Sequence, residues 1–210
     1  MNIREWMVIN LPKNSTILEA GIYDGSDTRF FADFFTEGEI YGFEPVPSLF
    51  HKASKILENK NNVEIYNKAL SDKTGSSKIY LSDRFGAVAG SSSLLSPKDH
   101  LKMHPQITFK EVINIETINL DEWFKSKNLE TIDFMWLDMQ GYEPKVLKSA
   151  LNTLSKTKYL FTEVSLIETY DNVTLYPEYK KFLSENGFEI IEEELPWKDM
   201  GNVLLKNKNY

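Results

Sequence analysis

The chain contains no cysteine, which excludes disulfide bonds, zinc sites built from thiolates and cysteine nucleophiles. Basic residues are also scarce: 24 lysines and arginines stand against 31 aspartates and glutamates, so the formal net charge is −7. A nucleic-acid-binding protein neutralises phosphates with a basic surface. The charge balance therefore argues against RNA or DNA as a partner or substrate.

Long apolar runs are missing as well. No window approaches the roughly 18–20 apolar residues of a membrane span, and the first twelve residues lack the apolar stretch of a signal peptide. We therefore expect a cytoplasmic protein without a membrane span. A hydrophobic fraction of 41% is enough for a full core, and the length of 210 residues fits a single α/β domain, residues 1–210.

Apolar runs of strand length alternate with segments of helical spacing. The first run stops at Gly21, as a buried parallel strand would, and four phenylalanines between residues 30 and 35 fall on one helical face, which assigns them to the core. The last two strands flank a turn and are expected to form a β-hairpin. This order predicts a doubly wound, mostly parallel α/β sheet with one antiparallel strand from the hairpin. The expected strands are 16–20, 39–43, 63–67, 132–137, 158–161, 188–192 and 202–206, with helices over 120–126 and from Pro47 and Pro177.

The segment before residue 120 breaks this alternation. Two strands, 78–81 and 110–115, enclose a Gly/Ser-rich loop and a proline-flanked stretch, and we expect residues 86–108 to cover the substrate as a loop or lid. Within it, His100 and His104 have i, i+4 spacing, which places them on one side of a short helix. The favoured interpretation is an exposed pair, and the alternative makes His104 a catalytic base within the lid.

A cofactor site is expected where the strand order reverses, between the first strand and the strand that ends at Asp138. Gly21 and Gly25 allow a tight turn and a close approach to a ligand, and Asp24 lies by the next helix start, where an acid can cap amide hydrogens. Glu44 ends the neighbouring strand and can accept hydrogen bonds from both hydroxyls of a ribose. In the alternative interpretation, the glycines form an ordinary turn and Glu44 is a solvated strand end.

The loop after the first strand is acidic, with Glu19, Asp24 and Asp27, and it lacks the third glycine of a pyrophosphate site. Carboxylates match the ammonium and sulfonium groups of S-adenosylmethionine better than they match phosphates. Tyr23 could lie against the sulfonium or simply pack. We therefore predict S-adenosylmethionine as the cofactor.

Six collinear segments resemble the FkbM-type methyltransferases, a family of S-adenosylmethionine-dependent enzymes. They span roughly residues 15–195, and their order and spacing carry the identification. These segments are ILEAGIYDGSDT, YGFEP, NKALSDKTG, VINIETINLDEW, LDMQGYEPKVLKSA, and FTEVS followed by YPEYKKFLSENGFEI. Gln140 departs from the family pattern, which commonly has glutamate there.

The resemblance implies a Rossmann-like, seven-stranded methyltransferase sheet and O-methylation of a sugar, glycolipid or related natural product. Together with the residues above, it places the cofactor against the following residues: Glu19, Gly21, Tyr23, Asp24, Gly25, Thr28, Glu44, Pro45, Ala69 and Asp138.

An alcohol acceptor is a poor nucleophile, so a positioned base would help methyl transfer. Asp138 is the leading candidate because it ends an apolar strand at the switch point, where burial could raise its pKa; alternatively, it caps the next turn. Glu163 ends the adjacent strand and is a second catalytic candidate, and His104 is the third. Glu143 is either a helix-dipole acid or a site residue. A carboxylate pair alone indicates a metal only weakly, so we predict none, with a divalent metal as the less favoured alternative.

The primary hypothesis is an O-methyltransferase acting on a small hydroxylated acceptor. One rival is a nucleotide-binding regulatory protein without transfer activity. The other is a dinucleotide-dependent oxidoreductase, for which the chain has no room for the usual second domain.

Overall fold

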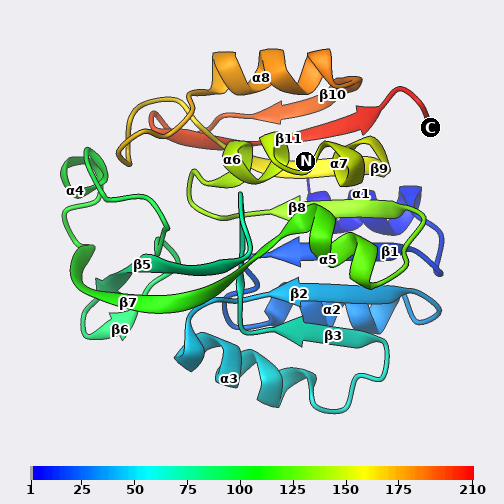
Figure 1. Cartoon of the computed structure of the whole chain (residues 1–210), viewed down its shortest axis with the longest axis horizontal. Helices are drawn as coiled ribbons and strands as arrows, with labels where there is room; N and C mark the ends of the chain where they lie inside the picture. The colour runs from blue at the N-terminus through cyan, green and yellow to red at the C-terminus, as the bar shows by residue number, and fades with distance from the viewer. Residues whose placement is uncertain (1) are drawn as a thin grey trace.

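The computed structural model describes residues 2–210, and a seven-stranded sheet forms its centre (Figure 1). The strand order is β10-β11-β9-β8-β1-β2-β3. All neighbouring pairs from β9 to β3 are parallel, whereas β11 runs antiparallel to both of its neighbours. The predicted doubly wound sheet with an antiparallel C-terminal hairpin strand is therefore confirmed. The strands are β1 (Thr16–Ala20), β2 (Glu39–Phe43), β3 (Val63–Tyr66), β8 (Ile132–Leu137), β9 (Thr157–Ser165), β10 (Phe188–Glu194) and β11 (Met200–Asn207).

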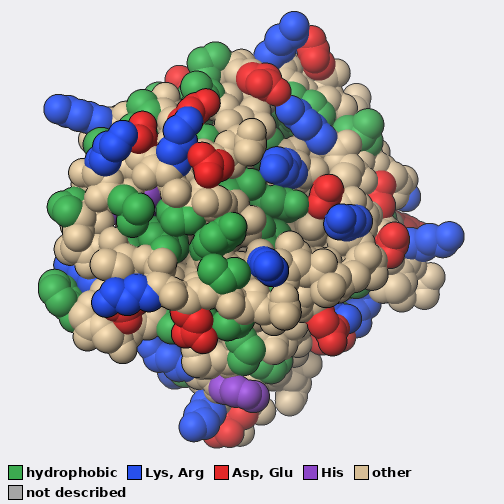
Figure 2. Space-filling model, turned by 60° about the vertical axis from the view of Figure 1, so that its left-hand side comes forward, with side chains coloured by type: hydrophobic (Ala, Val, Ile, Leu, Met, Phe, Trp, Pro, Cys, Tyr) green, Lys and Arg blue, Asp and Glu red, His purple; other side chains and the backbone are tan. Residues whose placement is uncertain are grey.

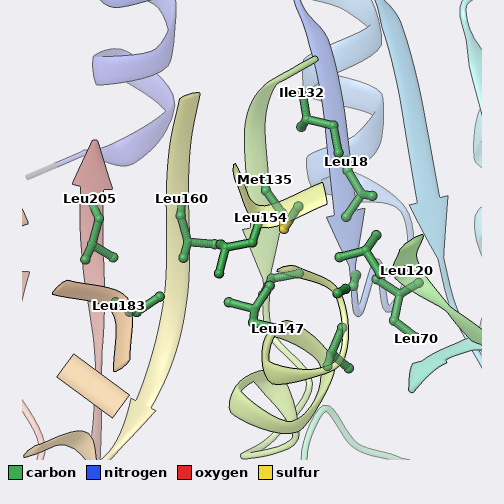
Figure 3. Close-up of a cluster of buried hydrophobic side chains, with 14 of the residues drawn as sticks. Leu18, Leu70, Leu120, Ile132, Met135, Leu147, Leu154, Leu160, Leu183 and Leu205 are labelled. Carbon is green, nitrogen blue, oxygen red and sulfur yellow. The ribbon is translucent and has the colours of Figure 1, made fainter. Parts of the chain in front are cut away.

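Helices cover both faces of this sheet because successive strand residues point to opposite sides. In β1, Ile17 packs with α1 and α2 on one face, while Leu18 packs with α5, α6, α7 and α8 on the other. Figure 3 shows the second face, where leucines from strands and helices meet around Met135. The helices are α1 (Ile3–Asn10), α2 (Ser26–Phe34), α3 (Pro47–Leu57), α5 (Leu120–Ser126), α6 (Glu143–Lys148), α7 (Leu151–Ser155) and α8 (Tyr176–Glu185).

The phenylalanines at 30–35 belong to the core, as predicted. Phe31 and Phe35 are fully buried against α1 and the sheet, and Phe30 and Phe34 pack at the edge of the same cluster. Proline in the first turn of α3 and α8 suits positions whose amide hydrogens have no helical partner. Gly187 follows α8 with φ +90°, which completes the proline-first, glycine-last pattern expected for that helix.

A second sheet of four strands, in the order β4-β7-β5-β6, lies at the carboxyl ends of the central strands (Figure 1). Its strands are β4 (Ala69–Ser71), β5 (Gly75–Arg84), β6 (Ala87–Val88) and β7 (Thr108–Asn119), and the short helix α4 (His100–Met103) lies between β6 and β7. The β5–β7 pair is antiparallel from Gly75–Thr117 to Asp83–Thr108, so both strands extend well beyond the predicted 78–81 and 110–115. None of the helices among residues 2–210 has the length and apolar character needed to cross a membrane.

Candidate active site

A cavity of about 300 Å³ opens at the carboxyl ends of β1, β2 and β8. Its walls are the loops that follow these three strands, and Ala89, Gly90 and residues 92–94, in the loop after β6, cover it. Figure 2 shows this end of the molecule, where hydrophobic side chains gather near the middle and most charged side chains lie around them. The cavity therefore lies at the predicted switch point of the sheet.

Gly21 allows the ends of β1, β2 and β8 to approach closely. Its backbone has φ +89°, and a Cβ atom there would lie 2.0 Å from the carbonyl oxygen of Asp138. The Gly21 amide donates to the Phe43 carbonyl at 2.9 Å, and the Asp138 amide donates to the Ala20 carbonyl at 3.0 Å. Because no side chain fits here, only glycine preserves this backbone wall.

Gly25 and Thr28, both predicted to contact the cofactor, do not line the cavity. Gly25 has φ +81°, and a Cβ atom there would lie 3.0 Å from the Cβ of Ala53, so its role is to let α2 pack against α3. The Thr28 hydroxyl donates to Glu19 Oε2 at 2.6 Å and thus orients that carboxylate from behind.

Glu44 is buried but lines the cavity at the end of β2. Its Oε2 accepts a hydrogen bond from the Tyr23 amide and its Oε1 accepts one from the Val46 amide, each at 2.9 Å. Burial raises the pKa of Glu44 to about 7 despite these two bonds. A carboxylate oxygen that accepts one hydrogen bond retains a lone pair. Glu44 is therefore held rigidly and can still accept two ligand hydroxyls.

Further acidic side chains surround the loop after β1. Burial raises the pKa of Glu19 to about 8, and the neighbouring charges of Asp27 and Asp138 add to this effect. Asp27 forms an ion pair with Arg4, whereas Asp24 accepts hydrogen bonds from the Ser26 amide and Lys52 Nζ, both at 3.2 Å. A cation in the cavity would favour the ionised form of Glu19, so this wall suits a positively charged ligand.

Tyr23, Pro45 and Ala69 also line the cavity. The Tyr23 ring is 39% exposed, and its hydroxyl reaches to 3.4 Å from the Val88 carbonyl on the opposite side. The loop after β1 thus meets the second sheet across the opening.

Three carboxylates converge at the end of β8. Asp138 is open to the cavity, and the buried Glu143 and Glu163 lie behind it, with one oxygen from each within 4.8 Å of the others. Burial raises the pKa of Glu143 to about 8 and that of Glu163 well above its ordinary value. The pKa of Asp138 is also raised, because protein is packed around the cavity into which its exposed carboxylate opens. Glu143 Oε1 accepts a hydrogen bond from the Met139 amide at 2.6 Å, so Glu143 is a structural part of the site and not only a helix-terminal acid.

The amide of Gln140 already bridges two of these carboxylates. Its Nε2 lies 2.7 Å from Asp138 Oδ1 and 3.0 Å from Glu163 Oε2. Among the described residues this is the group of acids close enough together for a cation, but proximity of acids alone does not make a metal site. We assign no metal to it. Glu163 itself does not line the cavity and contacts Asp138 through Gln140.

The two histidines lie away from the cavity. His104 Nε2 is 2.6 Å from Asp199 Oδ2, which ties α4 to the loop between β10 and β11. The expectation of an exposed pair is wrong for His100, which is 1% exposed and packs against Phe109 and Tyr170. Burial lowers the pKa of His100 to about 4. His104, the alternative base, therefore does not face the cavity.

Several cavity residues are absent from the predicted set. Trp136, Tyr142, Ser92 and Ser93 line the wall, and the Ser93 hydroxyl donates to the backbone carbonyl of Gln140 at 2.9 Å. The Gly/Ser-rich composition of residues 86–93 was the signal for the serines. Tyr142 lies in a recognisable motif, but nothing in its local sequence indicates that its side chain faces the ligand.

Comparison with known proteins identifies the family. Residues 19–190 match the model of the methyltransferase FkbM domain. Over 194 residues the chain is 31% identical to 2-O-methyltransferase NoeI of Sinorhizobium fredii, covering 91% of this chain and 79% of that protein. The chain belongs to the FkbM methyltransferase family. It is also 22% identical over 214 residues to methyltransferase sdnD of Sordaria araneosa, which covers 90% of this chain and 80% of that protein.

Solved structures agree with this fold. An Aeropyrum pernix fibrillarin, described with natively bound S-adenosyl-L-methionine, superposes with a TM-score of 0.55 at 16% identity, covering 95% of this chain and 70% of that chain. An rRNA methylase from Streptococcus thermophilus superposes with a TM-score of 0.54 at 15% identity, covering 98% of this chain and 93% of that chain. The FkbM-family protein described here is thus a Rossmann-like, S-adenosylmethionine-dependent methyltransferase, as predicted.

Proposed function

We propose that this FkbM-family methyltransferase is an O-methyltransferase whose acceptor is a hydroxyl of a sugar, glycolipid or related natural product. Bound S-adenosylmethionine supplies an electrophilic methyl group on its sulfonium. The proposal rests on one observation: two carboxylates open into the same cavity on either side of Gly21. Glu44 can accept hydrogen bonds from a ribose, and Asp138 is the candidate base.

The cofactor end of the cavity is formed by the loops after β1 and β2. Glu44 would accept hydrogen bonds from the two ribose hydroxyls, because both of its oxygens are fixed by backbone amides and retain lone pairs. Glu19 and Asp138 would balance the ammonium and sulfonium charges. Tyr23, Asp24, Pro45 and Ala69 complete this wall, and Gly25 and Thr28 support it from behind.

Asp138 would act at the acceptor end. Its raised pKa makes its carboxylate a stronger base than an aspartate surrounded by bulk water, and its opening to the cavity lets it take the proton from an acceptor hydroxyl. Glu163 would contribute through Gln140 rather than by contact with the acceptor. Alignment of the reacting groups and exclusion of water supply the rest of the rate acceleration.

We further propose that residues 1–210 act as a single methyltransferase domain and that residues 86–108 form its substrate-covering segment. Support comes from Ala89, Gly90 and residues 92–94, which line the cavity, and from the contacts of Tyr23 and Gln140 with this segment. Since part of the cavity wall comes from this segment, its sequence would set the acceptor specificity.

The proposed acceptor is a small molecule rather than a nucleic acid. The relative NoeI is described as a 2-O-methyltransferase, which supports a hydroxyl acceptor. The rRNA methylase among the structural neighbours shares the fold at 15% identity, and a net charge of −7 is unfavourable for binding the phosphates of RNA.

Thermal-shift measurements with S-adenosylhomocysteine, S-adenosylmethionine and NAD, followed by mass spectrometry of a hydroxylated acceptor library, test this function. We expect stabilisation by the two sulfur compounds, none by NAD, and a mass increase of one methylene unit on a hydroxylated acceptor. Stabilisation by NAD alone would overturn the cofactor assignment. Binding without transfer to any hydroxyl would favour a regulatory protein.

A further inference from the structure

Gln140 adopts an unusual conformation directly after the strand that ends at Asp138. Its φ is +54°, in the left-handed region that longer side chains avoid, and Gly141 follows with φ +90°. The side chain of Gln140 is also buried, with 8% of the residue exposed. Glycine would adopt this turn at less cost, so a buried glutamine here suggests that its side chain has a role of its own.

The amide group of Gln140 joins two carboxylates. One Nε2 atom lies within hydrogen-bond distance of both Asp138 Oδ1 and Glu163 Oε2, and an amide NH₂ has two hydrogens, one for each acceptor. The reverse orientation of the amide would point a carbonyl oxygen at two carboxylates, which is electrostatically unfavourable. Asp138 is therefore held by Gln140 on one side while it remains open to the cavity on the other.

The same residue contacts the segment that covers the cavity. The Ser93 hydroxyl donates to the Gln140 backbone carbonyl at 2.9 Å. The Tyr170 hydroxyl donates to the Ser91 carbonyl at 2.7 Å and lies 3.4 Å from Gln140 Oε1. Gln140 thus links Asp138 to Ser91 and Ser93 through bonds that are buried or partly buried, where they are strongest.

We infer that Gln140 is a positioning residue of the transfer site. It orients the Asp138 carboxylate toward the cavity and couples that orientation to the position of residues 91–93. This inference rests on the proposed role of Asp138 as the proton acceptor. Gln140 also lines the cavity, and the role inferred for its side-chain amide acts through Asp138, to which it donates.

The variant Gln140→Met tests this inference because methionine keeps the length of the side chain and lacks the donors. Hydrogen bonds to a carboxylate favour its ionised form, so their loss raises the pKa of Asp138. We expect the acidic limb of the kcat/KM profile to move to higher pH by about one unit, the shift that loss of one hydrogen bond to a charged group produces. The affinity for S-adenosylhomocysteine should change less than about threefold.

Asn128→Met provides the matched control, since Asn128 also has a positive φ, +53°, but lies on the surface away from the cavity. It replaces a residue that tolerates a positive φ, so it adds at least as much backbone strain as Gln140→Met, and it should leave the pH profile unchanged. A uniform loss of activity in Gln140→Met at every pH, without movement of the acidic limb, would overturn the inference, because a purely structural role has that signature.

A second measurement needs no acceptor and so separates this inference from the proposed function. Titration of the Asp138 carboxyl carbon by NMR, assigned with Asp138→Asn, should show a higher midpoint in Gln140→Met and a smaller rise in Ser93→Ala. An unchanged midpoint in Gln140→Met would overturn the inference even if methyl transfer were established. An unchanged midpoint in Ser93→Ala would refute the coupling to residues 91–93.

Discussion

The cofactor side of the cavity comes from residues 19–46, whereas the covering side combines residues 89–94 and 138–142, with residues 163–175 behind them. On the cofactor side, backbone groups fix the geometry. Glu44 accepts hydrogen bonds from two backbone amides, and the absence of a side chain at Gly21 lets the Asp138 carbonyl pack against it. On the covering side, side chains from distant segments bond one another, as Gln140 does with Glu163 and Tyr170.

This difference has a physical consequence. A wall made of backbone amides and a glycine tolerates little change in shape, and its buried acids Glu19 and Glu44 make its stability depend on pH. A wall made of buried side-chain bonds can be altered residue by residue, at the cost of sensitivity to pH. We therefore expect substitutions on the cofactor side to affect folding and binding, and those on the covering side to affect turnover and the pH dependence of turnover.

Gly21→Ala should have the largest effect. The new Cβ would overlap the Asp138 carbonyl and force a left-handed backbone on alanine, which we expect to cost roughly 3–5 kcal/mol of unfolding free energy. Urea denaturation of the wild-type protein and the variant measures this loss of unfolding free energy. Gly90→Ala is the control, because a Cβ atom at Gly90 would meet no other atom within 4 Å. Equal stability of the two variants would contradict the close approach of β1 and β8.

Asp138→Asn should leave folding nearly unchanged and lower turnover about 10²–10⁴-fold, the usual contribution of a general base. Single-turnover kinetics with a saturating cofactor concentration would separate transfer from binding. Asp99→Asn changes an acid of the covering segment outside the cavity and should retain wild-type turnover. Normal turnover in Asp138→Asn would remove Asp138 as the base.

Glu44→Ala should weaken the binding of S-adenosylhomocysteine by about 1.5–3 kcal/mol, or roughly 10–150-fold, the scale of hydrogen bonds to a charged group. Isothermal titration calorimetry measures this change. Glu37→Ala, an exposed acid before the same strand, should bind normally. If the two variants bound equally well, the ribose would have to lie elsewhere.

The stability of the cofactor side should fall with rising pH. Burial raises the pKa of Glu44 to about 7 and of Glu19 to about 8 in the fold, above the ordinary 4.5. Their contribution is therefore fully present below pH 4.5 and is lost as pH rises through 7–8. Glu19→Gln should stabilise the ligand-free protein at about pH 8.5 by about 1–2 kcal/mol and much less at about pH 5, as thermal unfolding at the two pH values would report. An equal gain in stability at the two pH values would contradict the raised pKa of Glu19.

The segment around His100 should show the opposite dependence, with a smaller effect. The pKa of His100 is lowered to about 4 from an ordinary 6.5, so its contribution is present above pH 6.5 and is lost as pH falls toward 4. Hydrogen exchange of residues 98–109 should accelerate at about pH 5 relative to about pH 7 once intrinsic rates are corrected. His100→Phe should abolish this acceleration; if the acceleration persisted, another group would be its cause.

Local patterns predicted most of the central sheet. The predicted boundaries of β1, β2 and β8 and of α5 match the structure, since these elements depend on apolar runs and on the residues that end them. The cofactor side could be predicted for the same reason, because Glu19, Gly21 and Glu44 lie at strand ends whose position in the sheet follows from the chain order.

Residues joined across long sequence distances could not be predicted in this way. The burial of His100 depends on Tyr170, and His104 turns away because Asp199 binds it. Gln140 stands out in the sequence only as a departure from the family pattern, since its partner Glu163 lies on the next strand of the sheet. The length of β5 and β7 likewise depends on their mutual pairing and not on their local apolar content.

A crystal structure of the protein with bound S-adenosylhomocysteine tests the central claim most directly. We predict both ribose hydroxyls within hydrogen-bond distance of the Glu44 carboxylate, with the sulfur on the side of the cavity that Asp138 faces. Adenosine bound elsewhere, or a ribose that makes no contact with Glu44, would contradict the assignment of this cavity.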